Sequence, residues 1–229
     1  MNIQILWQDF LGILPVVPQT VAMAAIIFIL SILIGTVMAL IQEYNIPILK
    51  QVVVVFKLLL RGTPLIVFIF IMYYSLPGII GFFTDMFNLD YNPNSMSPVI
   101  ILIVAVSLTV SSFQSETIRA SFLSVSYGQI EAARSLGYTP FQAFMRIITP
   151  QALVEALPEF SSAFLVVMKA ISLGFMITVI DIFAQSRLIA ASNSYYVEAF
   201  VVAALMYWVI AMIVVGLTNK LEERLASRS

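Results

Sequence analysis

Five long apolar runs divide the chain, and they restrict it to a fold that lies in a membrane. The runs cover residues 21–41, 65–83, 97–115, 160–180 and 199–219. Lys169 is the one charged residue within them. An α-helix rises about 1.5 Å per residue, so about 20 residues span a hydrocarbon core of about 30 Å. Because lipid offers the backbone no hydrogen-bond partners, each run is predicted to be a helix.

The charged residues are also too few for a soluble protein. They make up 10% of the 229 residues, whereas a soluble domain contains about 25%. We therefore expect an all-α integral membrane fold in a single transmembrane domain, residues 1–229. Its five helices are predicted at about 17–42, 62–84, 97–120, 152–180 and 197–219, with a polar loop at 126–150.

The distribution of basic residues predicts how these helices are oriented. Positively charged residues concentrate in cytoplasmic segments. The segments on one side of the predicted helices carry nine basic residues: Lys50, Lys57, Arg61, Arg119, Arg134, Arg146, Lys220, Arg224 and Arg228. The segments on the other side carry Asp85, Asp90 and Arg187. We expect the N-terminus outside and the C-terminus in the cytoplasm, and we expect no removable signal peptide, because the first 20 residues contain no Lys or Arg.

Several kinds of chemistry are excluded by the residue inventory. The chain contains no Cys and no His, which excludes the usual zinc sites and nucleophiles activated by His. It also contains no GxxxxGK[ST] phosphate-binding loop. We therefore expect a protein that is not an enzyme and that binds neither a cofactor nor a metal itself.

The polar segment between the third and fourth runs is predicted to form two short helices. Ser126 and Gln129 have the spacing of a capping box, so the first helix is expected to begin there. Gly137 would end that helix, as a glycine after the last turn often does. Residues 139–140, Thr-Pro, are a typical second start, and Pro150 would end this helix or kink it into the next run.

The same segment carries a recognisable spacing, EAA-x3-G-x9-I-x-x-P, between Glu131 and Pro150. It resembles the cytoplasmic docking loop of the permease subunits of ABC importers. Glu131 is expected in the first turn of its helix, where the helix dipole favours negative charge. The resemblance implies that an ATPase docks on Gln129, Glu131, Ala132, Ala133, Arg134, Leu136 and Gly137. The alternative for this segment is an ordinary loop between membrane helices, with well-capped short helices.

Four further segments extend the resemblance over most of the chain: 61–65 (RGTPL), 116–120 (ETIRA), 157–158 (LP) and 169–173 (KAISL). They are similar to segments of polar amino-acid ABC permeases, of the histidine/glutamine/arginine/cystine type. In the first of them, Thr63 is expected to cap a helix that starts at Pro64.

The resemblance implies the partners and the setting. It implies a five-helix core in a bacterial cytoplasmic membrane and a second permease copy or a related permease. It also implies an amino-acid substrate, an extracytoplasmic solute-binding protein and an ATPase dimer that binds ATP and Mg. It implies no nucleic acid.

Polar residues within the apolar runs are candidates for the substrate pathway, because ionisable groups in a membrane usually face a cavity or a partner. Lys169 would meet a substrate carboxylate, or pair with Glu159 or Asp181. Glu116 and Arg119 are three residues apart and would meet on one helix face. The candidates are Ser112, Gln114, Ser115, Glu116, Ser162, Lys169 and Ser172. The alternative for the serines is close packing between helices.

The sequence departs from the resembled family inside this pathway. The family commonly has Asp and Thr where Ala170 and Ile171 stand here, and Asn where Ser162 stands. The departures leave the docking interpretation intact and leave the substrate open, with cystine or another polar amino acid favoured. Whether the permease pairs with itself or with a relative is also open.

Two segments outside the runs are assigned a place. Residues 48–60 are expected as an apolar helix along the inner interface, and residues 88–98 as a turn-rich outer loop.

The function predicted from the whole chain is the membrane-spanning permease subunit of an ATP-driven importer for polar amino acids. The alternatives are a secondary transporter or channel subunit that works without an ATPase, and a structural scaffold.

Overall fold

The structure is a computed structural model that describes residues 3–226, except for the side chains of Asn94, Tyr127 and Ala226. Within these residues it is built from helices without a β-strand, and five helical stretches are long and apolar enough to cross a membrane. The expected all-α membrane fold is confirmed. The main membrane helices are α2 (Val17–Glu43), α4 (Leu65–Met86), α5 (Pro98–Leu123), α8 (Thr149–Ile171) and α10 (Tyr196–Ala226).

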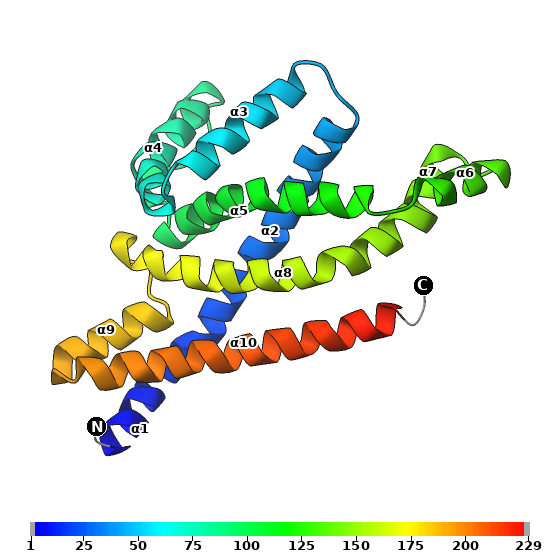
Figure 1. Cartoon of the computed structure of the whole chain (residues 1–229). Helices are drawn as coiled ribbons and strands as arrows, with labels where there is room; N and C mark the ends of the chain where they lie inside the picture. The colour runs from blue at the N-terminus through cyan, green and yellow to red at the C-terminus, as the bar shows by residue number, and fades with distance from the viewer. Residues whose placement is uncertain (1–2, 227–229) are drawn as a thin grey trace.

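Shorter helices connect or flank the five long ones. They are α1 (Ile3–Ile13), α3 (Leu49–Gly62), α6 (Tyr127–Ser135), α7 (Pro140–Ala143) and α9 (Ile182–Asn193). Figure 1 shows α5, α8 and α10 side by side, with α2 crossing behind them. The helices α1 and α9 lie at one end of the molecule, and α6 and α7 lie at the opposite end, between α5 and α8.

The core forms where α2 crosses α5 and α8. The contact is close because Gly35 of α2 has no side chain: a Cβ placed there would lie 3.0 Å from Cβ of Gln114 and 3.1 Å from the carbonyl oxygen of Ser111. Small residues permit such approaches in membranes, where lipid contacts compete with packing between helices. Buried apolar residues of α5 and α8, such as Leu102 and Ile171, complete the core.

The fourth membrane helix differs from its predicted bounds of 152–180. It begins at Thr149, leaves α-helical geometry at Ser172, and continues as a 3₁₀ helix over Ser172–Ile177. The chain then reverses at Thr178, which has φ +68°. Asp181 caps α9 by accepting a 2.8 Å hydrogen bond from the amide of Ala184, so the helix after the reversal has its own start.

The structure also differs from the expected elements at the N-terminus and at the start of α4. The helix α1, which precedes the first predicted membrane helix, was not predicted. Thr63 does not cap α4: its hydroxyl donates to the carbonyl of Leu59, 2.8 Å away, and Pro64 occupies the N-cap position. Thr63 is the C-cap of α3, and its amide donates to the same carbonyl over 3.1 Å, so its hydroxyl lies beside the last turn of α3. Arg228, counted above among the basic residues, lies outside the described residues.

Candidate functional site

Residues 126–150 hold the candidate docking residues and are called the docking segment here, and their first helix, α6, ends in a turn at Gly137, as predicted. Gly137 has φ +84°, a conformation that side chains with a Cβ adopt at a cost. Its amide donates to the carbonyl of Arg134 over 2.9 Å, and the amide of Tyr138 donates to the carbonyl of Ala133 over 3.0 Å. These two bonds are the Schellman motif, which satisfies the last carbonyls of a helix.

The second helix of the segment also starts as predicted. The Thr139 hydroxyl accepts from the Gln142 amide over 3.2 Å, and the Gln142 side chain accepts from the Thr139 amide over 2.9 Å. This reciprocal capping box holds α7 in place. The turn at Gly137 and the box at Thr139 set the angle between α6 and α7.

The start of α6 differs from the prediction in two details. Ser126 occupies the N-cap position, but its side chain forms no capping bond. The amide of Gln129 donates instead to the backbone carbonyl of Ser126 over 3.0 Å, so the predicted capping box is wrong. Because α6 begins at Tyr127, Glu131 lies beyond the first turn, and its predicted place in that turn is also wrong.

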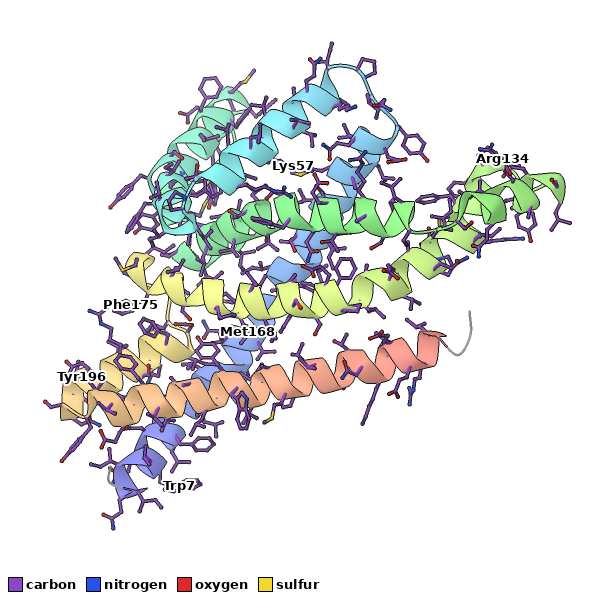
Figure 2. All side chains as sticks on the ribbon, in the orientation of Figure 1. Trp7, Lys57, Arg134, Met168, Phe175 and Tyr196 are labelled. Atoms are coloured by element: carbon purple, nitrogen blue, oxygen red, sulfur yellow. The ribbon has the colours of Figure 1, made fainter. Side chains whose placement is uncertain are left out.

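All but one of the candidate docking residues are exposed at the end of the molecule formed by α6 and α7. Ala133 is buried and packs inward. Leu136 is 79% exposed although it is a large apolar residue in a polar segment, and Figure 2 shows Arg134 at the same end. The remaining candidates, Gln129, Glu131, Ala132 and Gly137, are exposed as well. Their role in docking stays a prediction.

The docking segment is joined firmly to the membrane helices. From α7 the chain passes through a π-helical stretch, Phe144–Ile148, directly into α8. Pro150 lies in the first turn of α8, where a missing amide is tolerated, so it starts this helix and does not end the previous one. The ring centroids of Phe144 and Phe122, on α5, are 5.3 Å apart. The segment is therefore continuous with α8 and contacts α5.

Charged side chains join α2, α3 and α5 to one another. Lys57 of α3 forms an ion pair with Glu116 of α5, and Arg119 lies 3.5 Å from a carboxylate oxygen of Glu43 on α2. Glu116 and Arg119 lie on the same face of α5, as expected, but each forms its ion pair with a residue on another helix. Helix packing supplied partners that the local spacing did not indicate.

A cavity of about 410 Å³ lies between α3, α4, α5 and α8. Arg61 lines it at the end of α3, with its guanidinium 4.8 Å from the ring centroid of Phe113 and a 2.5 Å hydrogen bond to the carbonyl of Ser112. Glu159 and Ser162 of α8 line it too. The other lining residues are Leu60, Thr63, Leu65, Thr109, Val110, Phe113, Ala163, Val166 and Ala170.

Sequence reasoning found one of the polar residues of this cavity, Ser162, among the pathway candidates. It assigned Arg61 to the membrane interface and considered Glu159 as a partner of Lys169. The available signal was position: Arg61 lies four residues before the apolar run 65–83, and Glu159 directly precedes the run 160–180.

The four pathway candidates on α5 do not line this cavity. Ser112, Gln114 and Ser115 are buried within α5, and the two serine hydroxyls donate to carbonyls of their own helix. Glu116 lies outside the residues lining the cavity. Their assignment to the pathway stays a prediction.

Lys169 and Ser172, near the end of α8, also differ in their contacts. Lys169 is exposed on α8, and no hydrogen bond or ion pair joins it to Glu159 or Asp181, both of which the structure describes. Asp181 instead accepts from the Ser172 hydroxyl over 3.0 Å and from Tyr207 over 2.7 Å. The suggested Lys169–Asp181 pair is wrong, and Ser172 bonds within the fold.

Comparison with known proteins identifies this arrangement. Residues 31–227 match the family model described as "Binding-protein-dependent transport system inner membrane component". The chain is 34% identical over 226 residues to the "Probable amino-acid permease protein YxeN" of Bacillus subtilis (strain 168), covering 97% of this chain and 96% of the relative. It is 31% identical over 196 residues to the "L-cystine transport system permease protein TcyL" of the same organism, covering 86% and 80%.

Solved structures agree. A chain from the "Crystal structure of an amino acid ABC transporter with histidines" superposes with a TM-score of 0.81 at 25% identity, over 98% of this chain and 99% of that one. A chain of the MetNI methionine ABC transporter superposes with a TM-score of 0.76 at 16% identity, over 98% and 99%, and shows the shared fold. The chain therefore belongs to the family of binding-protein-dependent transport system inner membrane components, and it is the permease subunit of an ABC amino-acid importer in the bacterial inner membrane.

Proposed function

We propose that this permease carries polar amino acids through the cavity between α3, α4, α5 and α8, and that cystine is one of its substrates. The observation that carries the proposal is the pair of opposite charges on the cavity wall, Arg61 and Glu159. Ionisable residues in a membrane are costly, and they commonly mark substrate pathways. Cystine is included because a relative with 31% identity is named as an L-cystine transport permease.

The two charges suit the zwitterion that every amino acid carries. The planar guanidinium of Arg61 matches a carboxylate and can donate two parallel hydrogen bonds. The carboxylate of Glu159 is an acceptor for the substrate ammonium group. Apolar residues such as Val110 and Val166 form the rest of the wall, and a cavity of about 300–1,000 Å³ is the usual size for a small-molecule site.

The energy for transport would come from a separate ATPase dimer, which binds ATP and Mg, because the chain itself has no phosphate-binding loop. We place the ATPase on α6, where Leu136 is an exposed apolar anchor among polar side chains. In this arrangement the N-terminus lies outside, an extracytoplasmic solute-binding protein delivers the amino acid, and a second permease copy or a related permease completes the pathway.

The test is reconstitution in lipid vesicles. The chain is coexpressed with the ATPase and the solute-binding protein from neighbouring genes, and ATP hydrolysis and uptake are measured with L-cystine, L-glutamine, L-arginine and L-histidine. We expect at least one amino acid to stimulate hydrolysis and to accumulate only with ATP. Arg61→Met should reduce uptake by about 10- to 100-fold, because a hydrogen bond to a charged group contributes about 1.5–3 kcal/mol.

Lys50→Met is the matched control, since Lys50 lies on the same helix but is exposed and bonds Asn45. It should leave uptake unchanged. Accumulation driven by an ion gradient without the ATPase would contradict the proposal and favour a secondary transporter. Equal uptake by the Arg61→Met variant and the wild type would remove the cavity from the pathway.

A further inference from the structure

Lys57 is buried although it lies on a helix that faces mostly away from the rest of the chain. Val52, Val55 and Leu58 of α3 are exposed. The side chain of Lys57 is only 5% exposed, and Figure 2 shows it between α3 and α5. Its ammonium group donates to Oε1 of Gln42 over 2.8 Å and forms the ion pair with Glu116. A buried cation is costly unless it is paired and hydrogen-bonded, and both conditions are met here.

The ion pair is one of two polar links between α3 and α5. One turn after Lys57, Arg61 donates to the carbonyl of Ser112, which lies one turn before Glu116. Residues four apart share a helix face. The two links therefore run between the same faces of antiparallel helices, and the Lys57 link fixes the position along α5 at which Arg61 reaches the cavity.

The same link leads toward the docking segment. Gln42, the second partner of Lys57, adjoins Glu43, which faces Arg119 of α5. The helix α5 ends at Leu123, and α6 begins at Tyr127. The Lys57 cluster thus lies on the segment of α5 between the cavity and the docking helix.

We propose that Lys57 is a positioning residue that couples the substrate cavity to the docking segment. It holds Arg61 at the cavity wall and ties it to the part of α5 that leads into α6. A change in α6 would then reach Arg61 through α5 and Lys57, and a substrate held by Arg61 would influence α6 by the same route, since coupling between two sites is reciprocal. The inference rests on the proposed function, in which Arg61 contacts the amino acid and α6 contacts the ATPase.

The experiment uses the full permease–ATPase complex with its solute-binding protein in lipid vesicles. Three quantities are measured: the yield of assembled complex, the ratio of amino-acid-stimulated to basal ATP hydrolysis, and the amino acid imported per ATP. The probe is L-cystine or, where L-cystine does not stimulate the wild type, whichever of L-glutamine, L-arginine and L-histidine does. The variants are Lys57→Met, Lys57→Arg, the exchange of Lys57→Glu with Glu116→Lys, and Lys50→Met as the control.

We expect Lys57→Met to lower the amino acid imported per ATP by about tenfold, within the 5- to 150-fold range of couplings between sites. The stimulation ratio should fall with it. Lys57→Arg and the exchange variant should recover most of both quantities, because each restores a pair of opposite charges between α3 and α5. Lys50→Met should match the wild type, since that cation bonds Asn45 outside the cluster.

A merely structural role would give a different result. It would lower the yield of complex, while the complex that remains would keep the stimulation ratio and the import per ATP of the wild type, and this outcome would overturn the proposal. If Lys57→Met does not assemble, Glu116→Gln decides, because it removes the ion pair and leaves Lys57 its hydrogen bond to Gln42. Assembly with a lowered stimulation ratio supports the proposal, whereas assembly with the wild-type ratio, or no assembly, overturns it. Absence of stimulation in the wild type by any tested amino acid would instead contradict the proposed function.

Discussion

The hydroxyl of Tyr207 donates a 2.7 Å hydrogen bond to Oδ2 of Asp181, and this bond joins α10 to the junction between α8 and α9. The same carboxylate oxygen accepts from Ser172 over 3.0 Å, and the other oxygen caps α9. Asp181 is fully buried. Three donors therefore replace the hydrogen bonds to water that the buried carboxylate has lost. The carboxylate links α8, α9 and α10 at the end of the molecule opposite α6 and α7.

Removing one of these donors should destabilise the protein moderately. We expect Tyr207→Phe to lower the free energy of unfolding by about 0.6 kcal/mol and by no more than about 1.7 kcal/mol, the average and the maximum measured for hydrogen bonds between membrane helices. The midpoint of thermal unfolding in detergent is the measurement. Tyr195→Phe is the control, because Tyr195 is exposed in the loop before α10. An equal loss in both variants would show that the Asp181 bond contributes nothing of its own.

The close crossing of α2 and α5 should not tolerate a side chain at Gly35. The Cβ of Gly35→Ala would meet backbone atoms of Ser111 and Ser115 at 3.1 Å, and backbone cannot move aside as a flexible side chain can. We expect a loss of about 1–3 kcal/mol of unfolding free energy, typical of overpacking. Gly78→Ala, on α4, meets no atom of the described residues within 4 Å and should change the unfolding midpoint little. Equal midpoints for the two variants would refute the packing argument.

The turn that ends α6 should depend on Gly137. At φ +84° a residue with a Cβ costs about 1–2 kcal/mol, so Gly137→Ala should loosen the α6–α7 angle and reduce the amount of ATPase that copurifies. Gly128→Ala is the matched control within α6. Its Cβ would meet only the Ser126 hydroxyl oxygen, at an ordinary 3.7 Å, and alanine favours the helix by up to about 1 kcal/mol. Undiminished copurification with Gly137→Ala would show that the turn is dispensable.

The exposed side chain of Leu136 should contribute to ATPase binding without contributing to folding. We expect Leu136 to be a hot spot of this interface, where truncation of one side chain costs about 2 kcal/mol or more, so Leu136→Ser should weaken the measured affinity for the ATPase by about 30-fold. Thermal unfolding of the permease alone should be unchanged. Val197→Ser, a comparably exposed position on α10 near the opposite end, should retain the wild-type affinity. Loss of affinity in the Val197 variant alone would place the ATPase at the opposite end of the molecule, near the start of α10, and would contradict the prediction.

Local chemistry made several elements predictable from the sequence. The apolar runs had to become helices, because each must satisfy its backbone within itself in lipid. Gly137 ends α6 through bonds to residues at most five positions away, and Thr139 caps α7 through a residue three positions away. These interactions involve neighbours in the chain, so their spacing alone indicates them.

The tertiary structure decided the partners of the polar side chains. Lys57 pairs with Glu116, 59 positions away, and Arg61 with the carbonyl of Ser112, 51 positions away. The local spacing had suggested a Glu116–Arg119 pair, whereas α8 ends at Ile171 and is followed by Asp181, which is held by Tyr207, 26 positions further on. Spacing along a helix determines which residues share a face, but which helix that face meets depends on close approaches such as that at Gly35. The sequence by itself therefore determined the membrane helices and the shape of the docking segment, whereas packing decided which charges are paired and which line the cavity.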